Sequence, residues 1–150
     1  MIIIEDASHA LGAHYKSGEM VGSCKFSDMT TFSLHPVKGV TAGEGGIITT
    51  NDEDFANKCK IIRAHGMSAQ YQHTEFGYNY RMTDISASIG REQLKKLPNF
   101  NARRREIAER YNSELSELVI TPKNRSCLLY TSDAADDSLR VDLGGRRIIK

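Results

Sequence analysis

The sequence predicts an α/β fold, and three observations support this prediction. Short apolar runs rich in β-branched residues have the length of strands, beginning with Ile2-Ile3-Ile4. Helical patterns follow from residue 53 onward. An acid, Asp6, comes two residues after the end of the first apolar run, and a lysine, Lys38, follows the second. The carboxyl ends of strands are where α/β sheets bind ligands, so these two side chains mark a candidate site.

Three strands are expected within the first fifty residues. Ile2-Ile3-Ile4 shows no polar alternation, which is typical of a strand buried on both faces of a parallel sheet. Residues 7–27 are broken by three glycines and have the composition of a loop. Residues 29–33 form the second expected strand, and residues 47–50 form the third, which is entered from a pair of glycines.

Helices are expected in the second half of the chain. Residues 51–54 supply an N-cap and an acidic first turn for a helix that stops near Gly66. Residues 67–82 are polar and aromatic without a clear period, and we expect them to be irregular. Thr83 or Asp84 can cap the next helix, which Pro98 either ends or separates from its successor.

The last expected helix is long and amphipathic. Its polar face contains Arg103, Arg104 and Arg105, which we expect to be solvated. A helix with such a face normally buries its opposite side. The apolar stripe on that side consists of Ile107, Tyr111, Leu115 and Leu118.

Composition excludes several classes of protein. The chain has 150 residues, 39% of them hydrophobic and 26% charged, which suits a soluble globular protein. A formal net charge of +1 gives no bulk field that would favour nucleic acid or an anionic membrane, and no apolar run approaches the length of a membrane span. Cys24 and Cys59 lie far apart in sequence, which indicates reduced thiols in a cytoplasmic protein.

Lys38 is the first candidate for chemistry. It follows an apolar strand and precedes the glycine-rich turn at residues 43–46, an arrangement that can aim an amine at an electrophilic cofactor. A free lysine has a pKa of about 10.4, and burial beside a cationic ring lowers it. Pyridoxal 5'-phosphate needs such a lysine for its Schiff base and a carboxylate, here Asp6, for its ring nitrogen. On spacing alone, an ordinary surface lysine is the better interpretation of Lys38, and the alternative for Asp6 is a turn or helix-cap residue.

Five motifs of this sequence, in this order, resemble those of the DegT/DnrJ/EryC1/StrS family of sugar-nucleotide aminotransferases. The resemblance runs from Ile2 to about Leu118 and implies the architecture of fold type I pyridoxal-phosphate enzymes. Residues 22–32 are most similar to the branch that aminates a UDP-linked 4-keto-6-deoxy sugar on the way to pseudaminic acid. The motifs are Glu5-Asp6-Ala7-Ser8-His9-Ala10, Ser33-x-His35-Pro36-x-Lys38, Gly43-Glu44-Gly45-Gly46, Arg63-x-His65-Gly66 and Gly77-Tyr78-Asn79-Tyr80-Arg81-Met82-Thr83-Asp84.

The resemblance implies a role for each matching residue around the cofactor. Lys38 would form the Schiff base and carry a proton between the substrate and the cofactor. Asp6 would keep the ring nitrogen protonated, and His9 would hydrogen-bond the ring hydroxyl, although a histidine packed in the core is the alternative. Ser33 would bind the cofactor phosphate.

Three further residues have implied roles around the substrate or between subunits. Asn79 matches an asparagine that reaches the cofactor phosphate of a partner subunit, which implies a homodimer; a turn residue is the alternative. Arg81 would meet the sugar diphosphate or the glutamate carboxylate, or would brace Asp84. His35 would shape the pocket, or simply pack. No metal site is expected.

The implied activity is transfer of an amino group from L-glutamate to a 4-keto-6-deoxy sugar nucleotide, with UDP as the expected nucleotide. One alternative is a dehydratase of the same fold, although a histidine commonly stands in those enzymes where this chain has Lys38. A catalytically inactive, truncated remnant is the other alternative.

Family members are more than twice as long as this chain, so we expect an interior fragment that is inactive by itself. Residues 1–97 would form part of the large, cofactor-binding domain, and residues 98–126 a linker helix and the start of the small domain. Residues 127–150 match no motif of the family. Codons of a common transposase adapter translate to the run from Cys127 to Asp136, so we expect residues 127–150 to be adapter read-through.

Overall fold

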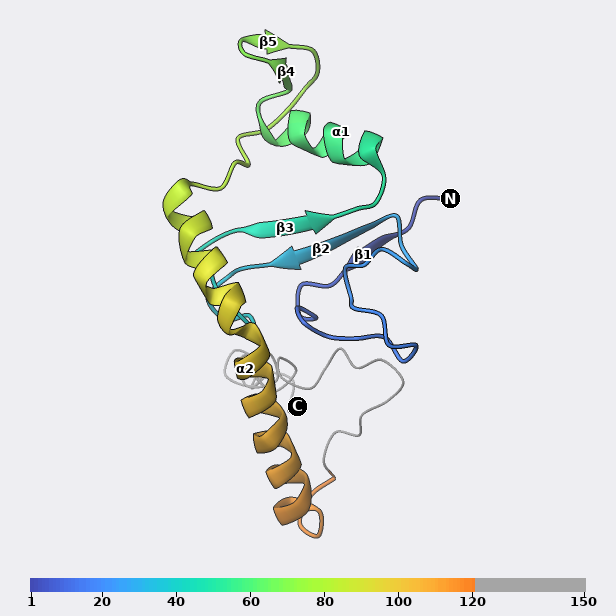
Figure 1. The fold of residues 1–150 in the computed structure, drawn as a ribbon, viewed down its shortest axis with the longest axis vertical. Coiled ribbons are helices and arrows are strands. Elements are labelled where there is room, and N and C mark those ends of the chain that lie inside the picture. The colour runs from blue at the N-terminus through green and yellow to red at the C-terminus, as the bar shows by residue number, and fades with distance from the viewer. Residues whose placement is uncertain (121–150) are drawn as a thin grey trace, which may run out of the picture.

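A three-stranded sheet forms the centre of the structure, a computed structural model that describes residues 1–120 (Figure 1). Its strands are β1 (Ile4–Asp6), β2 (Met29–Ser33) and β3 (Gly46–Thr49), in the order β1-β2-β3. β1 pairs with β2 in parallel, and β2 pairs with β3 antiparallel. The predicted α/β class is thus present, with β2 at the bounds expected from the sequence.

The parallel pairing brings two distant segments to one edge of the sheet. Asp6 is in register with Thr31, and the amide of Ala7 donates to the carbonyl of Thr31 at 2.9 Å. The carboxyl ends of parallel strands point the same way, so the chain leaves both strands on the same side. Asp6 and the start of the loop after Ser33 therefore lie close together at the same edge of the sheet.

The first strand differs from its expectation. β1 begins at Ile4, and the side chains of Ile2, Ile3 and Ile4 are 60%, 44% and 60% exposed. The prediction of a strand buried on both faces is therefore wrong for the chain as far as residue 120. β1 lies at an edge of the sheet, and no segment within these residues covers it there.

Two small apolar clusters support the sheet. The first joins Ala7, Ala10 and Val21 to Phe32, and Gly22 makes that contact possible, because a Cβ there would lie 2.7 Å from the Phe32 ring. The second cluster contains Leu34, Val40 and Ala42, covered by three helix residues, Leu94, Leu97 and Phe100. This second cluster forms the base of the loop that carries Lys38.

Helix α1 (Glu53–Arg63) begins as the sequence predicts. The Asp52 carboxylate accepts a hydrogen bond from the amide of Phe55 at 3.0 Å, and Glu53 and Asp54 lie in the first turn. A short hairpin follows, formed by β4 (Met67–Ala69) and β5 (Gln72–His73), at the far end of the molecule in Figure 1. The expectation that residues 67–82 lack regular structure is therefore wrong in its first half.

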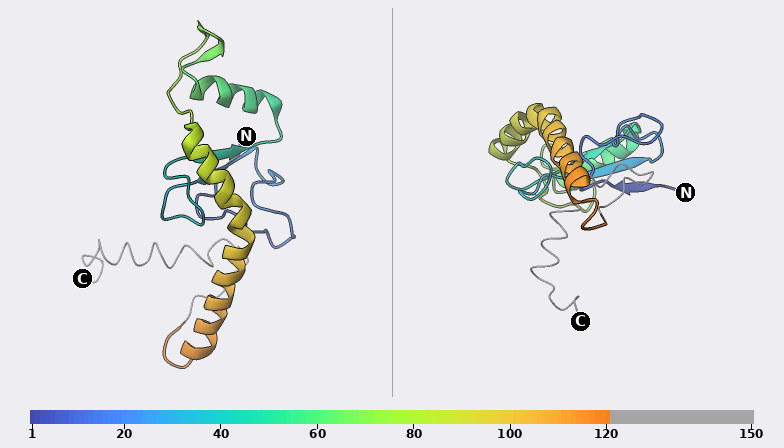
Figure 2. Two further views of the ribbon diagram at one scale, coloured as in Figure 1. Left: turned by 60° about the vertical axis from the view of Figure 1, so that its left-hand side comes forward. Right: turned by 90° about the horizontal axis from the view of Figure 1, so that it is seen from below.

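Helix α2 (Asp84–Leu115) crosses the end of the sheet and extends well beyond it (Figure 2). Thr83 caps it by accepting from the amide of Ser86 at 3.1 Å, as predicted. Pro98 lies inside the helix, so the expectation that it separates two helices is wrong. Proline removes one backbone donor, but Leu97 and Phe100 on either side pack onto the same cluster and hold the two halves in line.

The apolar stripe after Pro98 faces solvent in this part of the chain. Ile107 and Tyr111 are exposed, Leu115 is half-buried, and the helix ends at Leu115, before Leu118. None of the helices in residues 1–120 combines the length and apolar character needed to cross a membrane. The expected adapter-derived segment, residues 127–150, lies outside the described residues.

Candidate active site

Asp6 stands at the end of β1, where the chain turns sharply. The amide of Ser8 donates to Asp6 Oδ1 at 3.0 Å, and the Ser8 hydroxyl donates to the same oxygen. These two hydrogen bonds lower the pKa of Asp6 below its usual 3.8, and the nearby His9 and Lys38 lower it further. Asp6 is therefore ionised at neutral pH.

Lys38 lies in a loop that is closed at its base. Leu34 donates its amide to the carbonyl of Gly45 at 2.8 Å, and the amide of Ala42 donates to the carbonyl of Leu34 at 2.9 Å. Inside the loop, the amide of Lys38 donates to the carbonyl of His35 at 2.9 Å. The loop is thus a folded unit whose position follows from the end of β2.

The amine of Lys38 contacts the imidazole of His9 through Nζ and Nε2, and both side chains are half-buried. One of the two nitrogens must donate a proton and the other accept it. Together with the ionised Asp6, this pair places an amine, an imidazole and a carboxylate at the carboxyl ends of two parallel strands. Such a group can hold an electrophilic, cationic ring and move a proton.

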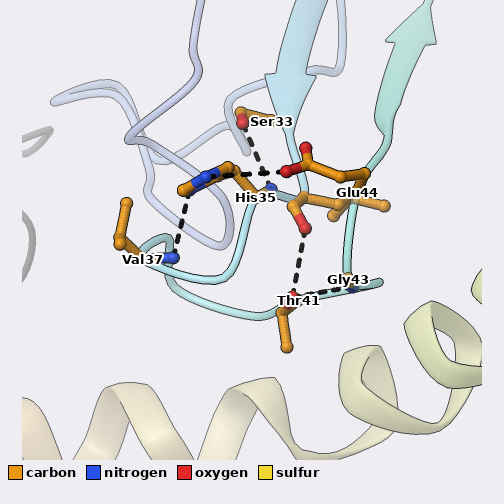
Figure 3. Close-up of polar contacts among 7 residues, drawn as sticks. Ser33, His35, Val37, Thr41, Gly43 and Glu44 are labelled. Atoms are coloured by element: carbon orange, nitrogen blue, oxygen red, sulfur yellow. Dashed lines mark hydrogen bonds and ion pairs between the residues drawn. The ribbon is translucent and has the colours of Figure 1, made fainter.

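Ser33 ends β2, and His35 lies at the start of the loop that leads to Lys38; Figure 3 shows their polar contacts. The Ser33 hydroxyl accepts from the amide of His35 at 3.3 Å. His35 Nδ1 accepts from the amide of Val37 at 3.4 Å, and its Nε2 lies 3.7 Å from the Glu44 carboxylate. Because Nδ1 accepts, the proton of the neutral ring belongs on Nε2, facing Glu44. His35 therefore braces its own loop.

Asn79 and Arg81 belong to a different part of the fold. Both are exposed and lie in the segment between β5 and α2. The backbone there is tied to the end of α1: the amide of Tyr78 donates to the carbonyl of Ile62 at 2.7 Å, and Asn79 pairs with Ala64. The structure does not join these two residues to the cluster of Lys38, His9 and Asp6.

Sequence reasoning missed two helix residues that bond to the loops of the site. Arg104 Nη2 donates to the carbonyl of Gly39 at 2.9 Å, and Asn101 Nδ2 donates to the carbonyl of Leu11 at 3.4 Å. The prediction of a solvated arginine face is therefore wrong for Arg104, which is half-buried. The missed signal was spacing: Arg104 lies four residues after Phe100 and seven after Leu97, on the buried side of the helix.

The side chains gathered here fit pyridoxal phosphate by their chemistry. Lys38 offers an amine, Asp6 a carboxylate with a lowered pKa, and His9 an imidazole that touches the lysine. Ser33 adds a hydroxyl at the end of β2. Within residues 1–120, no group of three or more acidic, histidine or cysteine side chains is arranged to hold a metal ion.

Comparison with known proteins gives a consistent answer. A profile of the DegT/DnrJ/EryC1/StrS aminotransferase family matches residues 1–131. The chain is 44% identical, over 119 residues, to the UDP-4-amino-4,6-dideoxy-N-acetyl-beta-L-altrosamine transaminase of Campylobacter jejuni, covering 77% of this chain and 31% of that protein. It is 40% identical, over 133 residues, to the GDP-perosamine synthase of Escherichia coli O157:H7, covering 87% and 36%. The chain thus spans about a third of these relatives.

Solved structures agree. Helicobacter pylori PseC, an aminotransferase of pseudaminic acid biosynthesis, matches with a TM-score of 0.70 at 34% identity, over 76% of this chain and 31% of that one. A sugar aminotransferase from Streptococcus pneumoniae, Spr1654, in its PLP form, matches with a TM-score of 0.69 at 36% identity, over 77% and 31%. The predicted fold, part of a fold type I pyridoxal-phosphate transferase, is confirmed. The chain belongs to the DegT/DnrJ/EryC1/StrS aminotransferase family.

Proposed function

We propose that the complete protein containing this chain transfers an amino group from L-glutamate to a UDP-linked 4-keto-6-deoxy sugar, with pyridoxal phosphate as cofactor. The contact between Lys38 and His9, beside the ionised Asp6, is the observation that carries the proposal. The family is one of sugar aminotransferases, and two of the relatives act on a UDP-linked sugar or in pseudaminic acid biosynthesis by name.

Pyridoxal phosphate, when bound, supplies an electron sink for the exchange of the amino group. Lys38 would hold the cofactor covalently and would move a proton at its Nζ atom. Asp6, whose pKa the hydrogen bonds from Ser8 lower further below neutrality, would be ionised and would keep a proton on the ring nitrogen. His9 would bind the ring hydroxyl, and Ser33 would bind the phosphate.

The proposal extends to a second subunit. Asn79 is exposed and its segment is held against α1, away from the Lys38 loop. This placement suits an amide that reaches the cofactor phosphate of a partner subunit in a homodimer, in the cytoplasm. Arg81, two residues on and also exposed, would meet the sugar diphosphate or the glutamate carboxylate. His35 would limit the pocket from the lysine loop.

The decisive experiment uses the complete enzyme, loaded with pyridoxal phosphate, and two matched substrates. One is a UDP-4-keto-6-deoxy-N-acetylhexosamine, and the other is GDP-4-keto-6-deoxymannose. Formation of 2-oxoglutarate from L-glutamate is followed together with the mass of the sugar product. We expect an amino sugar from the UDP substrate, with a kcat/KM at least about tenfold above that for the GDP substrate.

Each other outcome excludes part of the proposal. Amination of the GDP sugar alone would exclude the UDP assignment and favour the activity named for GDP-perosamine synthase. Loss of water from either sugar without consumption of glutamate would favour the dehydratase alternative. No change in either sugar, with cofactor bound, would exclude amination of both tested sugar nucleotides and with it the proposed UDP substrate.

A further inference from the structure

We infer that Arg104 and Asn101 of α2 are positioning residues, which set the place of Lys38 relative to the loop that carries Asp6 and His9. For its catalytic consequence, this inference rests on the proposed function. Its geometric content rests only on contacts between α2 and the two loops.

Arg104 fixes the lysine loop. Its Nη2 donates to the carbonyl of Gly39, the residue that follows Lys38, at 2.9 Å. The guanidinium lies 5.8 Å from the centre of the Phe100 ring, and Phe100 packs against the cluster at the base of the same loop. Because the side chain is half-buried and held at two places, it has little freedom to leave Gly39.

Asn101 fixes the other loop. Its Nδ2 donates to the carbonyl of Leu11, two residues after His9, at 3.4 Å. Gly12, at φ +79°, leaves room for this contact, since a Cβ there would lie 2.6 Å from Asn101 Nδ2. Tight backbone turns from Ala7 to Ala10 and from Ala10 to Ala13 make this loop a stiff unit that includes His9.

The two contacts are joined within one turn of the helix. Arg104 Nη1 donates to Asn101 Oδ1 at 3.1 Å, so one hydrogen-bonded chain runs from Gly39 through Arg104 and Asn101 to Leu11. The loops after β1 and β2 come from different strands, and α2 bridges them from outside the sheet. A displacement of α2 would therefore change the position of Lys38 Nζ relative to His9 and Asp6.

The test compares Arg104→Met with Arg105→Met in the complete protein, because Arg105 is an exposed neighbour that takes the same change. We expect Arg104→Met to lower kcat by roughly ten- to a hundredfold, with a smaller change in KM, since small displacements of catalytic groups carry penalties of this size. The pH profile of cofactor absorbance should also shift in Arg104→Met and not in Arg105→Met. Arg104→Lys keeps a hydrogen-bond donor but cannot bond Gly39 and Asn101 together through two guanidinium nitrogens. We therefore expect its kcat to lie between those of Arg104→Met and wild type.

A second readout needs no cofactor. Hydrogen exchange of the cofactor-free protein should be faster in Arg104→Met than in wild type over peptides 7–13 and 34–42, and unchanged in Arg105→Met. If Arg104→Met fails to fold, the same exchange comparison is made with Arg104→Lys, for which a smaller increase over the same peptides is expected.

The outcomes separate the two proposals. If wild type transaminates and the Arg104 variants match Arg105→Met in rate, pH profile and exchange, the positioning role is wrong and the function stands. If wild type does not transaminate but exchange still rises at both loops, the function is wrong and the structural linkage stands.

Discussion

Lys38 Nζ and His9 Nε2 are in contact, although Lys38 lies 29 positions after His9 in sequence. The parallel pairing of β1 with β2 explains this proximity, since Asp6 and Thr31 are in register and the chain leaves both strands on the same side. Residues 7–28 connect the end of β1 to the start of β2. The strand pairing thus brings the two loops of the candidate site together, and the contacts from α2 hold them.

Removal of the Lys38 amine should abolish covalent attachment of the cofactor. In the complete protein with pyridoxal phosphate, Lys38→Ala should lose the absorbance of the lysine-linked cofactor, and borohydride should no longer fix cofactor to the peptide that contains residue 38. Lys16→Ala, at an exposed lysine of the loop before β2, is the matched control and should retain both signals. Unchanged absorbance in Lys38→Ala would exclude the assignment of Lys38.

Removal of the Ser8 hydroxyl should raise the pKa of Asp6, because the side-chain hydrogen bond from Ser8 is the largest cause of its lowering. A carboxylate whose folded-state pKa lies below its usual 3.8 stabilises the protein above that pH, and this contribution is lost as the pH falls through the lowered value. Ser8→Ala should therefore have a lower free energy of unfolding near neutral pH than wild type. Its free energy of unfolding should also fall less steeply as the pH is lowered into the acid range.

The carboxyl carbon shift of Asp6, followed by NMR through an acid titration, measures this change directly. Ser68→Ala, in the exposed hairpin, should leave the Asp6 titration where it is in wild type. A Ser8→Ala protein whose Asp6 titrates as in wild type would show that the hydroxyl does not hold the carboxylate.

The parts of the fold that the sequence could predict are those set by local chemistry. Asp52 and Thr83 cap their helices because a short polar side chain precedes each helical pattern. β2 has its expected bounds, and its side chains alternate between buried and half-buried, with Thr30 and Phe32 facing inward. The grouping of Lys38 with Asp6 was predictable in outline, because both follow strands of the same sheet.

Three of the failures depend on tertiary contacts. Pro98 does not interrupt α2, because packing of Leu97 and Phe100 on one cluster outweighs a lost backbone donor. The spacing of Arg104 from Leu97 and Phe100 indicates its buried side, but its partner, the carbonyl of Gly39, lies 65 residues earlier and cannot be identified from local sequence. The isoleucines before Glu5 are apolar residues of the kind that are usually buried. Their burial requires a covering segment, which residues 1–120 do not supply.

Loss of the Tyr15 hydroxyl should lower the stability of the protein, because this group binds Glu5 of strand β1. This hydroxyl donates to Glu5 Oε1 at 2.6 Å, and the fully buried Thr30 donates to Glu5 Oε2 at 3.1 Å. Tyr15→Phe removes a charge-assisted hydrogen bond at a part-buried carboxylate, so we expect the free energy of unfolding to fall by about 1–3 kcal/mol. Urea unfolding of Tyr15→Phe and of Tyr111→Phe, an exposed control, measures the difference; equal stabilities would contradict this account.

The backbone of Gly66 lies so close to that of Glu75 that residue 66 should have no room for a side chain. A Cβ on Gly66, at φ +73°, would lie 1.8 Å from the carbonyl oxygen of Glu75, so the backbone itself would have to move. A Cβ on Gly18, at φ +98°, would have no atom within 4 Å apart from those of residue 18 and its two chain neighbours. Alanine at residue 18 therefore carries only the cost of the left-handed backbone conformation. That cost is about 1–2 kcal/mol, and it is common to both variants.

Gly66→Ala should therefore lose at least about 1 kcal/mol more unfolding free energy than Gly18→Ala, because displacement of a packed backbone adds to the conformational cost. The loss should be local, since Gly66 also accepts at its carbonyl from the amide of Thr74 at 2.9 Å and its amide donates to Ile61 at 3.0 Å. Hydrogen exchange over residues 67–80 should rise in Gly66→Ala and stay at the wild-type level in Gly18→Ala. Equal losses in the two variants would mean that the approach of Glu75 to Gly66 does not stabilise this segment, and that the position of Asn79 is set by the end of α1 alone.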